Sequence, residues 1–233
     1  ASTLRGEVED YAITVSPPVD FGDFASFGSA SSNSVTGLSV GTLTDAEITA
    51  TTDATATGDD VTGTDDEDGV TVPVKLAQNV ATSLTVNVTN TTGASAFLNV
   101  WIDFNRNGVL TDAGEQVAVN LDVATGTNNA ARVVNFTTPA GASIGVAGVR
   151  VRLTSTSGPG ATGASGNGEV EDVTTNLIAN TDFGDFSSFA SASSTNNATL
   201  RLGALIDSDL AGTNDATATA DDLDGTDDED GVT

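Results

Sequence analysis

Short runs of alternating hydrophobic and polar residues, separated by glycine, asparagine and proline, fill the chain between residues 69 and 177. The alternation is cleanest in Val149-Arg150-Val151-Arg152-Leu153. A period of two places the aliphatic side chains on one face of a strand, as a core face, and both arginines on the other, as a solvent face. Strands are expected at residues 70–76, 84–88, 96–104, 116–121, 132–137, 149–153 and 170–177. Short strands with such turns between them predict an all-β fold, with a β-sandwich over residues 69–177.

The sequence repeats itself at a constant offset of 162 residues. The matching segments are GEVED at 6–10 and 168–172, DFGDF at 20–24 and 182–186, and GTDDEDGVT at 63–71 and 225–233. An offset that does not drift indicates a tandem repeat unit of 162 residues.

The repeat divides the chain into four parts. Residues 1–15 correspond to the last strand of a preceding or partner-subunit sandwich, and residues 16–68 form a linker or small module rich in Ser, Thr and Asp. Residues 69–177 form the sandwich, and residues 178–233 contain a second copy of the linker module and the start of the next sandwich.

The strand expected near residues 6–15 needs a partner, and two explanations fit. Either the chain is a window on a longer tandem array, or this strand completes the sheet of a neighbouring subunit by strand addition. In the second case, the side chains that enter the neighbour are Val8, Tyr11, Ile13 and Val15. Both explanations make neighbouring copies of the same module the expected partners.

Composition narrows the possible chemistry. The chain has 33 Asp and Glu residues against 7 Lys and Arg residues, a formal net charge of -26, and neither Cys nor His. Disulfides, zinc sites with nitrogen or sulfur ligands, and imidazole catalysis are therefore excluded, so a bound metal must have oxygen ligands. The negative charge argues against nucleic acid as a partner, and the absence of a long apolar run argues against membrane insertion.

The clearest motif for a metal begins at Asp103 and resembles the start of an EF-hand loop. Calcium loops of that kind supply side-chain oxygens at positions 1, 3 and 5 and a carbonyl at position 7, with glycine at position 6. The closing glutamate here stands at position 13 instead of 12. The expected ligands are Asp103, Asn105, Asn107, Val109, Asp112 and Glu115. The alternative is a plain turn, because Asp, Asn and Gly all favour turns.

Clusters of acidic residues are further candidates for calcium ligands. Their members are Asp59, Asp60, Asp65, Asp66, Glu67 and Asp68, with the second copy Asp227, Asp228, Glu229 and Asp230. The competing interpretation is a solvated acidic linker. Glu169 and Glu171 lie on one face of the expected last strand, where they either share a cation or pair with Arg150 and Arg152.

Three motifs together resemble the GEVED domain family of bacterial secreted and cell-surface repeat proteins. They are the repeated Gly-Glu-Val-Glu-Asp, the segment Trp101-Ile102-Asp103-Phe104-Asn105, and Asp112-Ala113-Gly114-Glu115. The resemblance covers residues 69–177 and the partial copy at 1–15. It implies a β-sandwich module in large extracellular proteins at the bacterial cell surface.

These observations predict a structural, calcium-stabilised segment of an extracellular bacterial fibre, filament or adhesin stalk. The alternative is a calcium-dependent adhesion module that binds surface glycans or another surface, with Trp101 or Phe97 as a stacking platform. Catalysis is not expected and no catalytic residue is assigned, because carboxylate pairs are inevitable in so acidic a chain and few aromatic residues are available to shape a pocket.

Overall fold

A computed structural model describes residues 6–7, 9–13, 15, 18–58, 66–190, 192–209 and 214–219. These residues contain β-strands and no α-helix, so they offer no helical segment that spans a membrane. The strands are β1 (Val19–Phe21), β2 (Ala30–Asn33), β3 (Leu38–Val40), β4 (Val70–Thr71), β5 (Lys75–Ala77), β6 (Ala81–Asn90), β7 (Ala96–Ile102), β8 (Gln116–Val123), β9 (Thr127–Thr137), β10 (Gly145–Thr154), β11 (Gly163–Ile178), β12 (Thr181–Phe183) and β13 (Ser193–Thr195).

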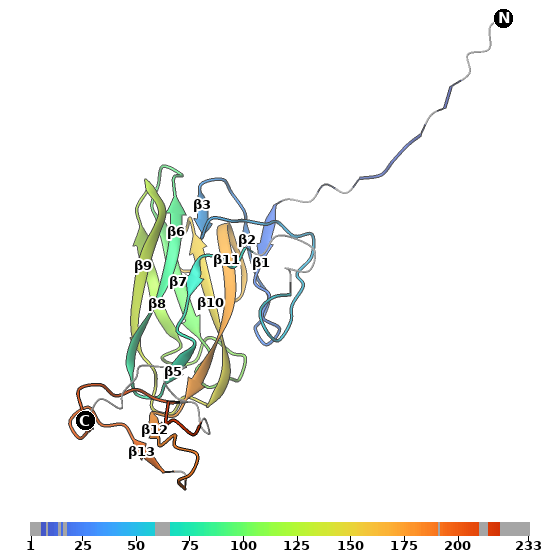
Figure 1. Ribbon diagram of the computed structural model, residues 1–233. Coiled ribbons are helices and arrows are strands. Elements are labelled where there is room, and N and C mark those ends of the chain that lie inside the picture. Colours follow the sequence, from blue (N-terminus) through green and yellow to red (C-terminus); the bar gives the residue numbers. More distant parts are fainter. Residues whose placement is uncertain are drawn as a thin grey trace, which may run out of the picture.

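Two large sheets form the body of the protein (Figure 1). The seven-stranded sheet has the order β1-β2-β11-β10-β7-β8, and β5 pairs with the far end of β11. The four-stranded sheet has β6 at its centre, with β9 on one side and β3 and β4 on the other. Most pairings are antiparallel, whereas β2 and β5 run parallel to β11.

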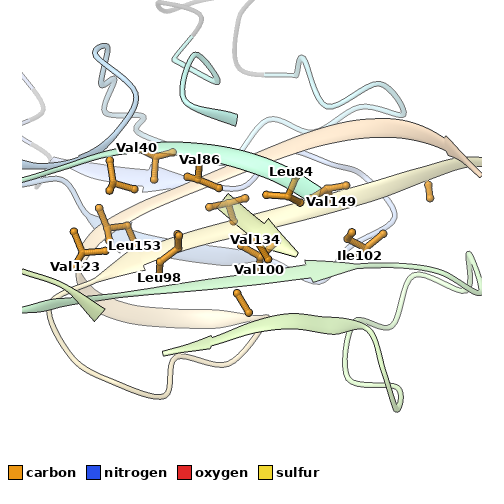
Figure 2. Close-up of a cluster of buried hydrophobic side chains, with 14 of the residues drawn as sticks. Val40, Leu84, Val86, Leu98, Val100, Ile102, Val123, Val134, Val149 and Leu153 are labelled. Carbon is orange, nitrogen blue, oxygen red and sulfur yellow. The ribbon is translucent and has the colours of Figure 1, made fainter. Parts of the chain in front are cut away.

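The sheets pack face to face around one aliphatic core (Figure 2). Val149, Val151 and Leu153 of β10 are fully buried in it, as the alternating pattern predicts. Leu84 and Val86 of β6 face them from the other sheet. The all-β class is thus confirmed, and its layers have the arrangement of a β-sandwich.

The strand expected at residues 70–76 is divided in the structure. β4 ends at Thr71 and pairs with β6, whereas β5 begins at Lys75 and pairs with β11 in the opposite sheet. Pro73 lies between them. Because proline lacks the N–H group that a sheet ladder needs, it marks the place where the chain leaves one sheet for the other.

Residues 18–58 join both sheets of the sandwich. β1 and β2 extend the large sheet through the pairing of β2 with β11, and β3 pairs with β6 in the small sheet. We call residues 18–58 the N-terminal cap. Leu38 and Val40 of this cap are buried in the sandwich core, at 1% and 0% exposed.

The N-terminal cap also covers the outer face of β10 and β11. Arg150 and Arg152 lie on that face and are both 0% exposed, so the prediction of an arginine-bearing solvent face is wrong. Phe24 and Phe27 of the cap form a second apolar cluster there, with Trp101. The alternating pattern places the arginines on the correct side of the strand, but it carries no information on what covers that side.

The two ends of the described chain differ in their packing. Tyr11, Ile13 and Val15 lie on a segment that extends away from the sandwich, and their side chains are about four-fifths exposed (Figure 1). At the other end, β11 ends at Ile178 and β12 begins at Thr181, where the β12–β13 hairpin starts.

Candidate metal centre

The GEVED motif at 168–172 lies on β11, and its acidic side chains alternate between the two faces of the sheet. Glu169 pairs in register with Leu153 and Glu171 with Val151, so both glutamates lie on the core side of the strand. Asp172 pairs with Arg150 on the outer side. The prediction that Glu169 and Glu171 share one face is confirmed, but the alternative that they pair with the arginines is wrong.

Both glutamates are buried beneath the edge of the small sheet, at 2% and 1% exposed. One oxygen of Glu169 accepts a hydrogen bond from the backbone N–H of Val40, and one oxygen of Glu171 accepts from that of Gly69 at 3.3 Å. The second oxygens, Oε1 of Glu169 and Oε2 of Glu171, are buried and have no hydrogen-bond partner among the described residues. A buried carboxylate oxygen without a partner is costly, so a cation or a bound proton would stabilise this strand.

Three more carboxylates gather beside these glutamates. Oxygens of Asp20, Glu47 and Asp66 lie within 4.8 Å of one another. Asp20 and Asp66 are 3% and 4% exposed, and Asp20 accepts a hydrogen bond from the N–H of Val170 on β11. The acidic centre therefore joins β1, the segment after β3, the segment before β4, and β11.

The electrostatics of the centre disfavour the ionised form of its carboxyl groups. Burial, together with the charges of Glu171, Asp66 and Asp68, raises the pKa of Glu169 to about 10. Burial also raises the pKa of Glu171 and of Asp20, and acidic neighbours again add to both shifts. All three carboxyls resist ionisation for the same physical reason, which is negative charge held away from water.

Calcium suits this donor set. It takes six to eight oxygen ligands, prefers carboxylates and tolerates irregular geometry. A divalent cation would neutralise the carboxylates and provide a partner for the second oxygens of Glu169 and Glu171.

The predicted acidic cluster before β4 is only partly in this centre. Asp66 is a member, and Glu67 is half-buried near Glu171. Asp68 is exposed and accepts hydrogen bonds from the N–H groups of Thr42 and Leu43, at 2.9 and 3.2 Å. The remaining predicted ligands lie outside the described residues: Asp59, Asp60, Asp65, Asp227, Asp228, Glu229 and Asp230.

The loop at 103–115 forms a second, smaller candidate site. The Asp103 carboxylate is buried and accepts hydrogen bonds from the N–H groups of Asn107 and Gly108, at 3.1 and 2.8 Å. The Asp112 carboxylate accepts from the side-chain amides of Asn105 and Asn107, at 2.7 and 2.8 Å. These contacts lower the pKa of Asp112.

Glu115 closes this loop from its far end. One of its oxygens accepts a hydrogen bond from the N–H of Asn105 at 3.3 Å, and the other is buried with no partner within the described ranges. Burial raises the pKa of Glu115, and Asp103 and Asp112 add to the shift. Val109 donates its N–H to the side-chain oxygen of Asn107 at 2.7 Å. The structure thus gathers the predicted side-chain ligands of the loop around one turn.

Comparison with known families agrees with this arrangement of motifs. Residues 97–176 match the model of the GEVED domain. The chain contains a GEVED domain. The matched residues run from β7 through β11 and include both the 103–115 loop and the glutamates of β11. No curated protein matches the chain.

The outer face of the GEVED domain carries a balanced ion pair instead of an acidic cluster. Arg150 donates to both oxygens of Asp172, with Nε to Oδ1 at 2.8 Å and Nη2 to Oδ2 at 2.7 Å. Its Nη1 donates to the carbonyl oxygens of Gly28 and Ala161, at 2.6 and 3.0 Å. Every charge of this pair is matched inside the protein, so it requires no metal.

Trp101 lies under the N-terminal cap and is 3% exposed. It packs with Phe24 and Phe27. In this position it fills the space between the cap and the GEVED domain and cannot stack on an external sugar. The hypothesis that Trp101 forms an outward stacking platform for sugars is therefore wrong.

Asp20 and Glu47 of the acidic centre were not predicted from the sequence. Asp20 belongs to the repeated DFGDF motif, whose recurrence at an offset of 162 was visible. The repetition of an aspartate within a motif that contains two phenylalanines could have indicated that Asp20 lies at a packed interface. Glu47 lies in a polar segment, and its only signal was the acidic residue Asp209 at the same offset.

Proposed function

We propose that this chain is a structural, calcium-stabilised segment of an extracellular bacterial fibre, filament or adhesin stalk, joined to neighbouring copies of the same module. The observation that carries the proposal is the pair of buried glutamates on β11, each with an oxygen that has no partner among the residues that the structure describes. Calcium sites in extracellular modules operate at roughly 10⁻⁴–10⁻³ M. Such sites hold modules rigid in a calcium-rich exterior.

Calcium would act in this module as a clamp between distant segments. The acidic centre draws ligands from the N-terminal cap, from the segment before β4 and from the GEVED domain. An ion that binds only the folded arrangement stabilises it by mass action. The N-terminal cap would then be fastened to the sandwich in calcium and loosened by a chelator.

The short connection after β11 supports a stiff serial arrangement. Only two residues separate Ile178 from Thr181, and Lys75 of β5 pairs with Asp207 in the second repeat copy at 3.5 Å. The β12–β13 hairpin lies at the end of the sandwich, as Figure 1 shows. A junction this short, with a contact across it, restricts bending between successive units.

The pairing of β11 favours a tandem array over strand addition. β11 pairs with β10 along one edge and with β2 and β5 along the other, so this sandwich already has its last strand. Residues 6–15 would fit only a sandwich that lacks that strand. We therefore assign residues 1–15 to a preceding module of a tandem array. Strand addition between subunits is the alternative way in which modules would be joined.

Thermal unfolding of the full chain tests the proposed function. The transition would be followed in excess EDTA and in millimolar calcium, with bound metal counted by elemental analysis and magnesium as the control ion. We expect at least one calcium ion per chain and a clear rise in Tm with calcium. No bound metal and no shift in Tm would overturn the calcium-stabilised module.

A further inference from the structure

The second repeat copy folds locally like the first. We call the described residues between 180 and 219, which are 180–190, 192–209 and 214–219, the C-terminal cap. Its strands β12 and β13 pair in the register of β1 and β2. Phe186 and Phe189 stack edge to face at 4.8 Å and 63°, and Phe24 and Phe27 do so at 4.8 Å and 66°. The local fold of the cap therefore does not depend on the surface that the N-terminal copy covers.

The two caps differ in what covers their apolar side chains. Equivalent positions and their exposed fractions are Phe27 at 8% and Phe189 at 75%, Leu38 at 1% and Leu200 at 80%, and Val40 at 0% and Leu202 at 75%. In the N-terminal copy these positions are buried against the GEVED domain and β6. The N-terminal cap thus shows which surface fits the exposed side chains of the C-terminal cap.

A glycine gives independent support for docking. A Cβ atom at Gly22 would lie 2.7 Å from Arg150 Nη2 and 2.8 Å from Asp172 Oδ2. The backbone of the cap therefore comes so close to this ion pair that only glycine fits at position 22. At the equivalent Gly184, the nearest contact of such an atom is the Cβ of Ala192 at 4.0 Å. No contact among the described residues of the C-terminal cap requires glycine there, whereas docking on an Arg–Asp pair would.

The C-terminal cap also carries part of an acidic centre. The N–H of Phe183 donates to Asp209 at 2.9 Å, just as the N–H of Phe21 donates to Glu47 at 3.0 Å. Asp182 stands at the position of Asp20. In the N-terminal copy, the GEVED domain completes this arrangement through Glu169 on β11.

We propose that the C-terminal cap is a preformed docking surface for the GEVED sandwich of a second copy, and that calcium completes the interface. The sandwich would supply the Arg150–Asp172 pair and the two glutamates of β11, and the cap would supply Gly184, Asp182 and Asp209. This inference rests on the proposed function, because in a tandem array the sandwich that docks on the C-terminal cap would belong to the next module.

Docking on a second copy of this chain must compete with the cap already present there. Ala190 and Thr199 stand where the N-terminal cap has Gly28 and Gly37, whose added Cβ atoms would come within 2.8 and 2.3 Å of side-chain atoms of Thr162 and Thr91. The C-terminal cap therefore binds this sandwich more weakly than the N-terminal cap does. A test must first release the N-terminal cap.

Gly22→Val in the full chain releases the N-terminal cap, because the new side chain collides with the ion pair. In millimolar calcium we expect head-to-tail oligomers, seen as a weight-average sedimentation coefficient that rises with protein concentration and falls on addition of EGTA. Trp101, the only tryptophan, lies under the cap. Its emission should shift to the red in dilute protein and return to the blue as the oligomers form.

Gly22→Val/Gly184→Val is the matched control and should stay monomeric with red-shifted emission. If valine at position 22 unfolds the sandwich, Gly22→Ala is a milder release of the same cap. A released variant that stays monomeric in calcium, or that associates equally with Gly184→Val, overturns the docking surface. Calcium binding and Tm of the unmodified chain are read separately, so loss of the docking result alone leaves the proposed calcium stabilisation standing.

Discussion

The two faces of strand β11 bury acidic residues in different ways. On the outer face, Asp172 has a fully matched partner in Arg150. On the inner face, Glu169 and Glu171 lie two residues apart with other carboxylates as neighbours, and burial raises the pKa of both. The GEVED motif thus combines a self-sufficient ion pair with two buried glutamates that a cation would neutralise.

This difference separates two contributions to stability. The ion pair should stabilise the fold in any buffer, because both charges belong to the protein. The inner face should stabilise it only when a cation is present, and should destabilise it otherwise. The effect of an outer-face variant should therefore be independent of a chelator, whereas the effect of an inner-face variant should depend on it.

Arg150→Ala should have the largest effect. It leaves Asp172 buried without its partner, which costs about 3–5 kcal/mol of unfolding free energy. The loss should be the same in calcium and in EDTA, as measured by guanidinium unfolding. Arg201→Ala, at an exposed position, is the control and should change little. A loss that appears only in calcium would contradict the separation of the two faces.

Glu169→Gln/Glu171→Gln should change sign with the buffer. In calcium at 100 times Kd, the variant should lose about 2.7 kcal/mol of stabilisation. In EDTA it should unfold at a higher temperature than the parent, because two buried acidic groups have been removed. Glu7→Gln/Glu9→Gln makes the same change in the exposed copy of the motif and should have no effect in either buffer. Equal effects of the two double variants would remove the inner face as a metal centre.

Metal-free protein should lose stability as the pH rises. The pKa of Glu169 is about 10 in the folded protein and near 4.5 in the unfolded chain. Between pH 4.5 and pH 10 the unfolded chain loses this proton while the folded protein keeps it, so the free energy of unfolding falls as the pH rises. We expect a loss of about 2.7 kcal/mol between pH 6 and pH 8 in EDTA, at about 1.36 kcal/mol per pH unit. Calcium should flatten this dependence, since the bound carboxylates are already ionised. Urea unfolding at a series of pH values measures both curves.

Asp103→Ala should have the smallest effect, about 1–2 kcal/mol, because it removes two backbone hydrogen bonds and one candidate calcium ligand of the 103–115 loop. Part of the loss should depend on calcium, which isothermal titration and Tm can separate. Asp122→Ala, at an exposed position on β8, is the matched control. Identical small losses for both variants would indicate a plain turn at 103–115.

Local sequence predicted much of this molecule correctly. Alternation in Val149 to Leu153 identified a core strand, and the spacing of Asp103, Asn105 and Asn107 identified side chains that meet around one turn. Both succeed because strand pleating and short loops place neighbours in sequence close together in space. The GEVED motif likewise placed Glu169 and Glu171 on one face.

Burial of the arginines and assembly of the acidic centre depended on tertiary structure. Arg150 is buried because a segment more than a hundred residues earlier covers it, and Glu169 meets Asp20 through the same cap. Strand periodicity assigns a side chain to a face, but burial and pKa depend on what packs against that face. The sequence by itself determined most strands of the sandwich, the repeat and the local loop, whereas only the packing of the cap decided which charges are paired within the protein and which carboxylates are buried beside one another.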